Sequence, residues 1–348
     1  MKAFFGLLIV LVTAGNTLAQ SSAERVHISY SSGGVTSIDL FIARDKKYFQ
    51  EQKLNAELIR MSANLAISAG IAGEIDVLGS VGSAIRSIRR GAPLRVISVT
   101  LRRQLFFLVA RPEYGGIKDL KGKTMGIVTF GGGQHTTAKR MLAPGGLNAD
   151  KELTAIQVGE ESVLLQALTA NSIQVAAISP PYAQIAKEKF NMKILETSTD
   201  KFASIQNGAA VNLKTLQDKP DFLKRFLRAR AQANKYFMER EKEASELLAS
   251  IWKSDYKIAN DSYRASKPAF TGTGIPSEEE IKEYLALDAQ ILGLAQPVAP
   301  SSVFDFTCSA KLTKNWGSNK RSRGSALRDM AMAISQGELK LSCRSRVH

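Results

Sequence analysis

Short apolar, β-branched segments alternate with helical segments along most of this chain. The segments RVHISY, NAELIRM and IDVLGS each precede a stretch with apolar residues at helical spacing, the first with Ile38, Phe41, Ile42 and Phe49 on one side. LRVISVT and LFFLVARP are expected to complete this first unit as further strands. The alternation is typical of βαβ units, so we expect an α/β fold with a largely parallel sheet.

The same alternation restarts after Pro112 and predicts a second α/β unit. KTMGIVT, TAIQVG, IQVAAISPP and MKILET are its predicted strands, and SIQNGAAVN is a strand after it. Three helices follow at residues 221–239, 242–253 and 277–292, the last starting with a capping box of Ser277 and Glu280. Because these helices have no sheet of their own, we expect them to cover the first unit, with the second unit inserted within it.

The N-terminus has the pattern of a secretory signal. Lys2 precedes an apolar stretch at residues 3–14, and Thr17 and Ala19 place small residues where a signal peptidase reads them. The stretch is too short to span a membrane. We expect residues 1–19 to be a signal peptide cleaved after Ala19. Because no cysteine follows the apolar stretch, we expect a soluble, exported protein without a lipid anchor.

The C-terminal segment is basic. The chain has a formal net charge of +15, and residues 309–348 hold nine Lys and Arg against two acidic residues, a net +7. We expect residues 301–348 to form a disordered basic tail, with polyanion binding as the alternative. Cys308 and Cys343 lie at or inside this tail and could pair in an oxidising compartment. The other charges are spread along the chain, so we expect no nucleic-acid partner.

The main body has few groups suited to catalysis. It has no cysteine before Cys308, its histidines are His27 and His135, and no cluster has the spacing of metal ligands. A G-x-S-x-G elbow is absent, GGIKDLKGKT departs from phosphate-loop spacing, and Thr136 stands where a dinucleotide fingerprint needs its third glycine. We therefore expect no catalytic residue, no metal and no cofactor.

Small and hydroxyl-bearing residues follow the predicted strands at the edge where open α/β sheets bind ligands. The five segments are SSGG, SAN, GSVGS, TFGGGQHTT and SPPY. In TFGGGQHTT the glycines and the following helix start can bring backbone N–H groups to an anionic or polar group, although a flexible turn is the alternative. We expect a cleft between two domains that binds a polar ligand without reacting with it.

The chain resembles the periplasmic substrate-binding proteins of ABC importers, of the nitrate/sulfonate/taurine and thiamine-pyrimidine-precursor type. The segments that carry the resemblance are YFQEQKLNAELIRM, AGEIDVLGSVGSAIRSIRRGAPLRVI, IKDLKGKTMGI and LQALTANSIQVAAISPPY, within residues 25–306. It implies a two-lobed, type II periplasmic binding protein fold with a ligand cleft between the lobes. It also implies a periplasmic monomer that delivers its solute to a permease in the inner membrane.

The resemblance also implies lobe boundaries and ligand contacts. Lobe I is expected at residues 20–110 and 205–300, lobe II at 111–204, and a two-strand hinge near 109–112 and 204–207. The family's contacts fall on residues of the five segments: Ser32, Gly33, Asn64, Gly79, Ser80, Gly132, Gly133, His135, Thr136, Pro180 and Tyr182.

The expected solute is small and anionic or heteroaromatic, such as a sulfonate, a nitrate-like ion, a carboxylate or a pyrimidine. An arginine that faces the cleft would pair with an acidic group, and the candidates are Arg44, Arg60, Arg102 and Arg103. One alternative is a pyrimidine-precursor-forming enzyme on the same fold, which would need a cysteine-rich iron site that the body lacks. Another is a secreted protein that binds polyanions or a surface through its basic tail.

Overall fold

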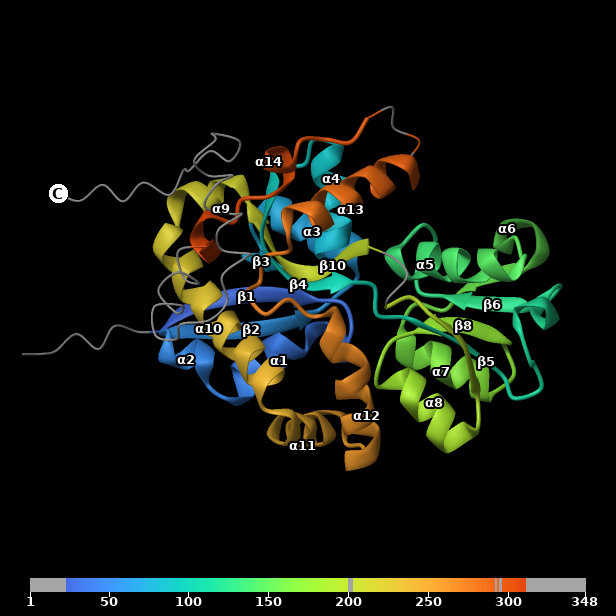
Figure 1. Ribbon diagram of the computed structural model, residues 1–348. Helices are drawn as coiled ribbons and strands as arrows, with labels where there is room; N and C mark the ends of the chain where they lie inside the picture. Colours follow the sequence, from blue (N-terminus) through green and yellow to red (C-terminus); the bar gives the residue numbers. More distant parts are fainter. Residues whose placement is uncertain (1–22, 200–202, 292, 294–295, 311–348) are drawn as a thin grey trace, which may run out of the picture.

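The computed structural model describes residues 23–199, 203–291, 293 and 296–310 of the chain (Figure 1). These residues form two α/β lobes that lie side by side, each built on one five-stranded sheet. The predicted signal peptide and everything after residue 310, including Cys343, lie outside the described residues. Among the residues that are described, none of the helices combines the length and the apolar character that a membrane span requires.

Lobe I has a mixed sheet with the strand order β2-β1-β3-β10-β4. Its strands are β1 Glu24–Tyr30, β2 Leu54–Arg60, β3 Val77–Leu78, β4 Leu94–Arg103 and β10 Ala203–Asn212. β1 pairs in parallel with β2 and β3, as the βαβ pattern predicts. β10 pairs antiparallel with β3 and β4, because it enters the sheet from lobe II rather than through a crossover helix.

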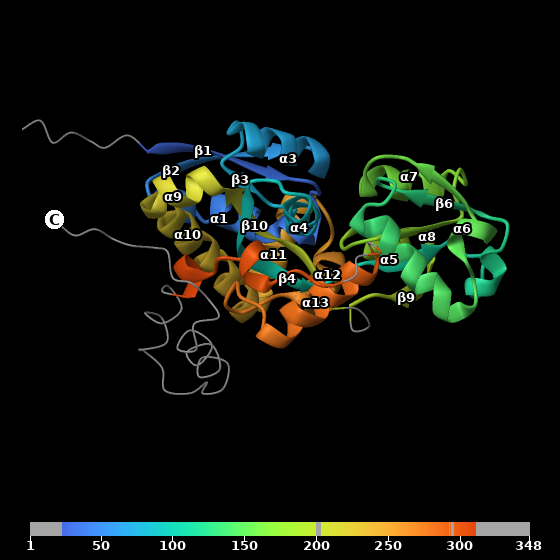
Figure 2. The ribbon, with the colours of Figure 1, turned by 90° about the horizontal axis from the view of Figure 1, so that it is seen from above.

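Helices cover both faces of this sheet (Figures 1 and 2). They are α1 Ile38–Asp45, α2 Tyr48–Glu51, α3 Ala63–Ala72, α4 Val81–Arg89, α9 Leu213–Asp218, α10 Pro220–Glu239, α11 Glu241–Trp252, α12 Tyr256–Ser266, α13 Glu278–Ile291 and α14 Pro300–Val303, with 3₁₀ turns η1 Val35–Ser37 and η4 Lys267–Ala269. The long helix expected after residue 37 is interrupted where Lys47 has φ 61°, which separates α1 from α2. Phe49 of α2 stacks on Phe226 of α10 at 6.0 Å, so the returning helices complete the core of lobe I.

Lobe II has the strand order β7-β6-β8-β5-β9. Its elements are β5 Phe107–Ala110, η2 Ile117–Leu120, β6 Thr124–Ile127, α5 Gly133–Leu142, η3 Ala143–Gly145, α6 Ala149–Glu152, β7 Thr154–Gln157, α7 Glu161–Thr169, β8 Val175–Ile178, α8 Tyr182–Phe190 and β9 Lys193–Thr197. β6 pairs in parallel with β7 and β8, whereas β5 runs antiparallel to β8 and β9. Both sheets are therefore mixed rather than largely parallel.

The chain crosses between the lobes at positions that differ from the predicted hinge. β4 leads to β5 through residues 104–106, and the second crossover lies between the end of β9 at Thr197 and the start of β10 at Ala203. Of the expected hinge residues, 109–112 lie in lobe II, the first two of them in β5, and 204–207 lie in β10 of lobe I. The prediction was wrong because LFFLVARP has the pattern of one continuous buried strand, although its first two residues belong to the crossover, and no glycine or proline marks the three crossover residues before β5.

Residues 300–310 pack against lobe I, so the expected tail boundary at residue 301 is too early. Phe304 forms a β-bridge with Val96, and its ring stacks on Phe306 at 5.3 Å. Val303 and Cys308 are also buried. The apolar side chains of VFDF belong to the core of lobe I. The pairing of Cys308 with Cys343 stays a prediction.

Candidate ligand-binding site

A cavity of about 490 Å³ lies between the two lobes, within the range of small-molecule sites. Its wall comes from the ends of strands and the starts of helices in both lobes. Lobe I contributes Ser32, Asn64, Ser80 and Arg86, and lobe II contributes Thr129, Gly132, Gly133, Gln157 and Glu161. The crossover residue Gln104 lines it as well. The cavity therefore occupies the position at which open α/β sheets bind ligands.

Five of the eleven predicted site residues lie on this wall. They are Ser32, Asn64, Ser80, Gly132 and Gly133. The other six, Gly33, Gly79, His135, Thr136, Pro180 and Tyr182, belong to the same loops and helix starts but have other contacts.

The segments SSGG and SPPY meet each other directly. The backbone N–H of Val35 donates to the carbonyl of Pro180 at 3.0 Å, and this bond joins lobe I to lobe II. The carbonyl of Gly33 accepts from the Trp252 indole at 3.0 Å, and a Cβ on Gly33 would lie 4.0 Å from the Tyr182 hydroxyl. Gly33, Pro180 and Tyr182 therefore lie at a contact between the lobes rather than on the cavity wall.

Gly79 is required by the packing of two strands. Its N–H donates to the carbonyl of Ser29 at 3.0 Å, and a Cβ at this position would lie 2.7 Å from the same oxygen. A larger residue would have to push β1 away from the end of β3. The close packing of β1 and β3 therefore explains why position 79 is a glycine, and no ligand contact is needed to explain it.

The three glycines before α5 differ in what they require. Gly131 has φ +70°, which favours glycine, whereas Gly132 is the N-cap of α5 with φ −68°. A Cβ on Gly132 would lie 3.1 Å from the carbonyl of Thr129. A Cβ on Gly133 would make ordinary van der Waals contacts, with Arg86 Nη2 at 3.8 Å and Gln104 Nε2 at 3.9 Å as its nearest neighbours.

His135 and Thr136 hold this loop in place. His135 Nδ1 accepts a hydrogen bond from the N–H of Gly131 at 3.0 Å, which requires a neutral ring with its proton on Nε2. Burial, together with the charge of Lys139, lowers the pKa of His135 and favours the same form. The Thr136 hydroxyl donates to the carbonyls of Gly132 and Gly133, each at 3.1 Å.

Charged residues line the cavity, and most of them have a partner. Arg60 forms an ion pair with Glu160 across the two lobes. Glu161 is buried and accepts hydrogen bonds from the Ser179 N–H at 2.6 Å and its hydroxyl at 2.5 Å. Burial raises the pKa of Glu161 despite these bonds. Arg86 Nε lies 3.6 Å from Asp288 of α13.

The sequence analysis missed Arg86, Gln104, Gln157 and Glu161. Of the four arginines it named, Arg60 reaches the cavity, whereas Arg44 pairs with Asp45, and Arg102 and Arg103 lie beside Glu280. Arg86 could have been found from helical spacing. It lies one turn after Gly82 and Ser83 on the helix that follows GSVGS, and all three line the cavity.

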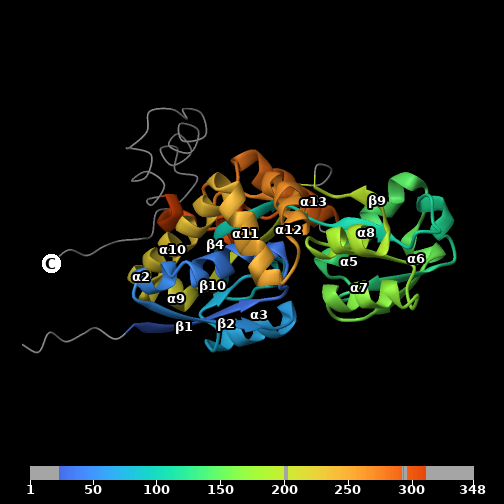
Figure 3. The same ribbon diagram turned by 90° about the horizontal axis from the view of Figure 1, so that it is seen from below.

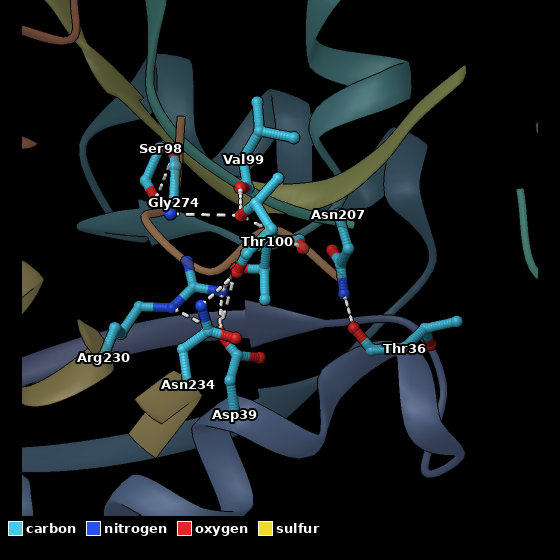
Figure 4. Close-up of polar contacts among 10 residues, drawn as sticks. Thr36, Asp39, Ser98, Val99, Thr100, Asn207, Arg230, Asn234 and Gly274 are labelled. Atoms are coloured by element: carbon cyan, nitrogen blue, oxygen red, sulfur yellow. Dashed lines mark hydrogen bonds and ion pairs between the residues drawn. The ribbon is translucent and has the colours of Figure 1, made fainter. Parts of the chain in front are cut away.

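A buried polar network lies behind the loop that leads into α1 (Figure 4). Arg230 Nε donates to Asp39 at 2.7 Å, and the Thr100 hydroxyl donates to the same carboxylate at 3.1 Å. Asn207, on the cavity wall, donates its amide N–H to the carbonyl of Thr36. These bonds fix the position of the loop between β1 and α1 relative to β4, β10 and α10.

Comparisons with known proteins agree with this geometry. Residues 35–244 match the model of a family described as NMT1/THI5 like, and a comparison with curated proteins finds no match. The alkanesulfonate-binding protein SsuA from Xanthomonas axonopodis pv. citri, solved with MOPS, is 16% identical, with a TM-score of 0.68 over 80% of this chain and 98% of that one.

Two further structures show the same fold. The nitrate-binding protein NrtA from Synechocystis PCC 6803 is 15% identical, with a TM-score of 0.58 over 94% of this chain and 93% of that one. A Candida albicans gene product described as having the generic periplasmic binding protein fold is 13% identical. Its TM-score is 0.60 over 94% of this chain and 99% of that one. The two lobes thus have the periplasmic binding protein fold, as the sequence resemblance implied.

Proposed function

The chain belongs to the NMT1/THI5-like family, and we propose that it is the solute-binding component of an ABC-type importer. The observation that carries the proposal is the cavity between the lobes, to which both lobes contribute polar residues. The solved structures that resemble this chain include proteins described as alkanesulfonate-binding and nitrate-binding. In this role the protein captures a small anionic or heteroaromatic solute and delivers it to a membrane permease.

We propose that the solute contacts residues on the cavity wall. Ser32, Asn64 and Ser80 supply side-chain donors and acceptors from lobe I, and Gly132 and Gly133 supply bare backbone from lobe II. The residues at the contact between the lobes act indirectly, by holding the cavity closed around the solute.

Binding without catalysis is part of the proposal. The two cavity carboxylates are engaged, Glu160 by Arg60 and Glu161 by Ser179, whose side chain is buried away from the described cavity wall. General acid–base chemistry needs a titratable group within hydrogen-bond reach of the reacting atoms. This arrangement favours holding a solute over converting it.

We further propose that the protein works in the periplasm after cleavage behind Ala19. The mass of the mature protein from a periplasmic fraction tests this, because it must correspond to a chain that begins at Gln20. Intact Met1 in that fraction would contradict the predicted export route.

Native mass spectrometry of the gently purified protein tests the main proposal. We expect one small molecule per chain, which is released on unfolding and raises the melting temperature when it is added back. Gly133→Trp, which adds an indole at the cavity wall, should abolish this effect. Gly116→Ala is the control, because its Cβ meets nothing within 4 Å and the residue lies in the turn before η2, outside the cavity wall. Chemical conversion of the released molecule by the protein would instead favour the enzyme alternative.

A further inference from the structure

Two arginines of α4 share one carboxylate beside the cavity. Arg86 lies 3.6 Å from one oxygen of Asp288, and Arg89 forms an ion pair with the other. The side chains of Asp288 and Arg89 are 5% and 2% exposed, and Arg89 Nε and Nη2 have no hydrogen-bond partner among the described residues. The cluster therefore holds one positive charge more than its carboxylate neutralises. An uncompensated charge in a buried setting is costly.

The excess charge faces lobe II. A Cβ on Gly133, the first residue of α5, would lie 3.8 Å from Arg86 Nη2. The N–H groups in the first turn of a helix have no partner within the helix and carry the positive end of its dipole. Two positively charged groups, Arg86 from lobe I and the start of α5 from lobe II, thus approach each other at the cavity.

The side-chain amide of Gln104 lies at the same place, and its oxygen lacks a hydrogen-bond partner among the described residues. The Gln104 side chain is on the cavity wall, and its Nε2 would be 3.9 Å from a Cβ on Gly133. The residue is 8% exposed. Gln104 Nε2 donates to the Ser204 hydroxyl at 2.5 Å, so an N–H₂ group lies on the Gly133 side of the cavity.

The protein's own nearby acidic groups are already engaged. Glu160 pairs with Arg60, and Glu161 accepts two hydrogen bonds from Ser179. Tyr284 packs beside the arginine cluster, and its pKa is raised by burial and by Asp288, so it stays a neutral hydroxyl. A compensating negative charge at Arg86 therefore has to come from the solute.

We propose that the solute carries an anionic group that binds between Arg86 and the start of α5, and that this group drives closure of the lobes. The inference rests on the proposed function and selects the anionic class over a neutral heteroaromatic one. Without an anion, the like charges of the two lobes oppose their approach. With an anion between them, each lobe attracts the same group, so binding and closure are coupled.

The test uses pairs of charged and neutral probes of one shape. The probes are linear alkanesulfonates and alkanoates of two to eight carbons, nitrate, and the matching methyl sulfones and amides. Calorimetry measures affinity, and small-angle X-ray scattering measures closure. We expect one anion to bind and close the protein, with its neutral partner at least about tenfold weaker.

Variants then locate the effect at Arg86. Arg86→Gln should lose about tenfold or more in anion affinity and all anion-driven closure. Its melting temperature without solute should stay equal or rise, because Asp288 and Arg89 are left as a balanced pair. Arg86→Lys should recover part of the affinity. Arg44→Gln removes the same charge from the exposed pair with Asp45, and it should bind like the wild type.

The outcomes separate the two proposals. Equal binding of the neutral partner, binding of a neutral pyrimidine alone, or full anion affinity in Arg86→Gln would overturn this inference and leave the solute-binding function standing. If no probe binds and no molecule accompanies the purified protein, the proposed function fails, and the inference fails with it.

Discussion

Arg60, the last residue of β2, and Glu160, the residue before α7, form an ion pair that joins the two lobes. α3 and α7, which follow these residues, lie on the same face of the molecule (Figures 2 and 3). A second set of contacts joins α12 to α8, where Lys257 pairs with Glu188 at 2.7 Å and Lys189 pairs with Asp255 at 3.2 Å. Charge pairs thus link the lobes at two separate places.

Reversing one charge of the first pair should favour the open form. The side chains of Arg60 and Glu160 are 41% and 46% exposed, so the pair itself contributes at most about 1 kcal/mol. In Arg60→Glu two carboxylates would face each other, and solute affinity should fall by about three- to tenfold. Calorimetry and small-angle scattering measure affinity and opening. The double variant with Glu160→Arg should restore both, and a double variant no better than the single one would contradict this role.

The glycines before α5 should separate affinity from stability. Gly133→Val should weaken solute binding by about thirtyfold or more, because its side chain would occupy the space beside Arg86 and Gln104. Its melting temperature without solute should change little. Gly131→Ala should instead destabilise the protein by about 1 kcal/mol, because Gly131 has φ +70°. Equal affinity of Gly133→Val and the wild type would mean that the stretch is only a turn.

Acid should weaken the loop that His135 holds. In the native protein burial lowers the His135 pKa, so the unfolded chain binds more protons as the pH falls below about 6.5. The stabilisation is therefore fully present above that pH and is lost below it. Protonation also removes the acceptor of the Gly131 N–H, so solute affinity should fall over the same range.

NMR titration of the imidazole C–H signals measures this shift directly. His27 lies in lobe I outside the cavity wall and serves as the reference signal. His135→Gln should flatten the pH dependence of affinity between pH 5 and about 7, because the side chain no longer titrates. A His135 signal that titrates above that of a model histidine would contradict the assignment.

Local patterns predicted many elements because their causes are local. Strand–helix alternation located β1, β2 and β3, and the Ser277–Glu280 capping box forms as expected, with bonds of 3.0 and 3.1 Å. α12 was not predicted, because YKIANDSYRAS has several polar residues, and its apolar face is apparent only against the helices around it. β5 was expected in the sheet of the first unit but belongs to the sheet of lobe II. Which of the two sheets a strand joins is a property of the whole fold.

The candidate site was predicted at the level of loops rather than of side chains. All five glycine- and hydroxyl-rich segments lie where the lobes face each other, because strand ends converge at one edge of each sheet. Which residues reach the cavity depends on how far the lobes close. The Val35–Pro180 bond removes Gly33, Pro180 and Tyr182 from the cavity wall, and no sequence pattern specifies that contact.

The buried pair of Arg230 and Asp39 should matter for stability more than for binding. Their side chains are 4% and 1% exposed, and Thr100 is their further partner (Figure 4). Arg230→Met would leave the Asp39 carboxylate buried with the Thr100 hydroxyl alone, which should cost about 3–5 kcal/mol of unfolding free energy. Asp39→Asn in the Arg230→Met background should recover much of this, because no charge then stays unpaired.

Urea unfolding followed by circular dichroism measures both changes, and calorimetry with the identified solute measures affinity. Neither Arg230 nor Asp39 lines the cavity between the lobes, so the double variant should bind within about threefold of the wild type. A large loss of affinity in a stable double variant would mean that the pair positions the loop between β1 and α1 for binding. A single variant as stable as the wild type would mean that Asp39 becomes protonated or hydrated, and the pair would then be dispensable for the fold.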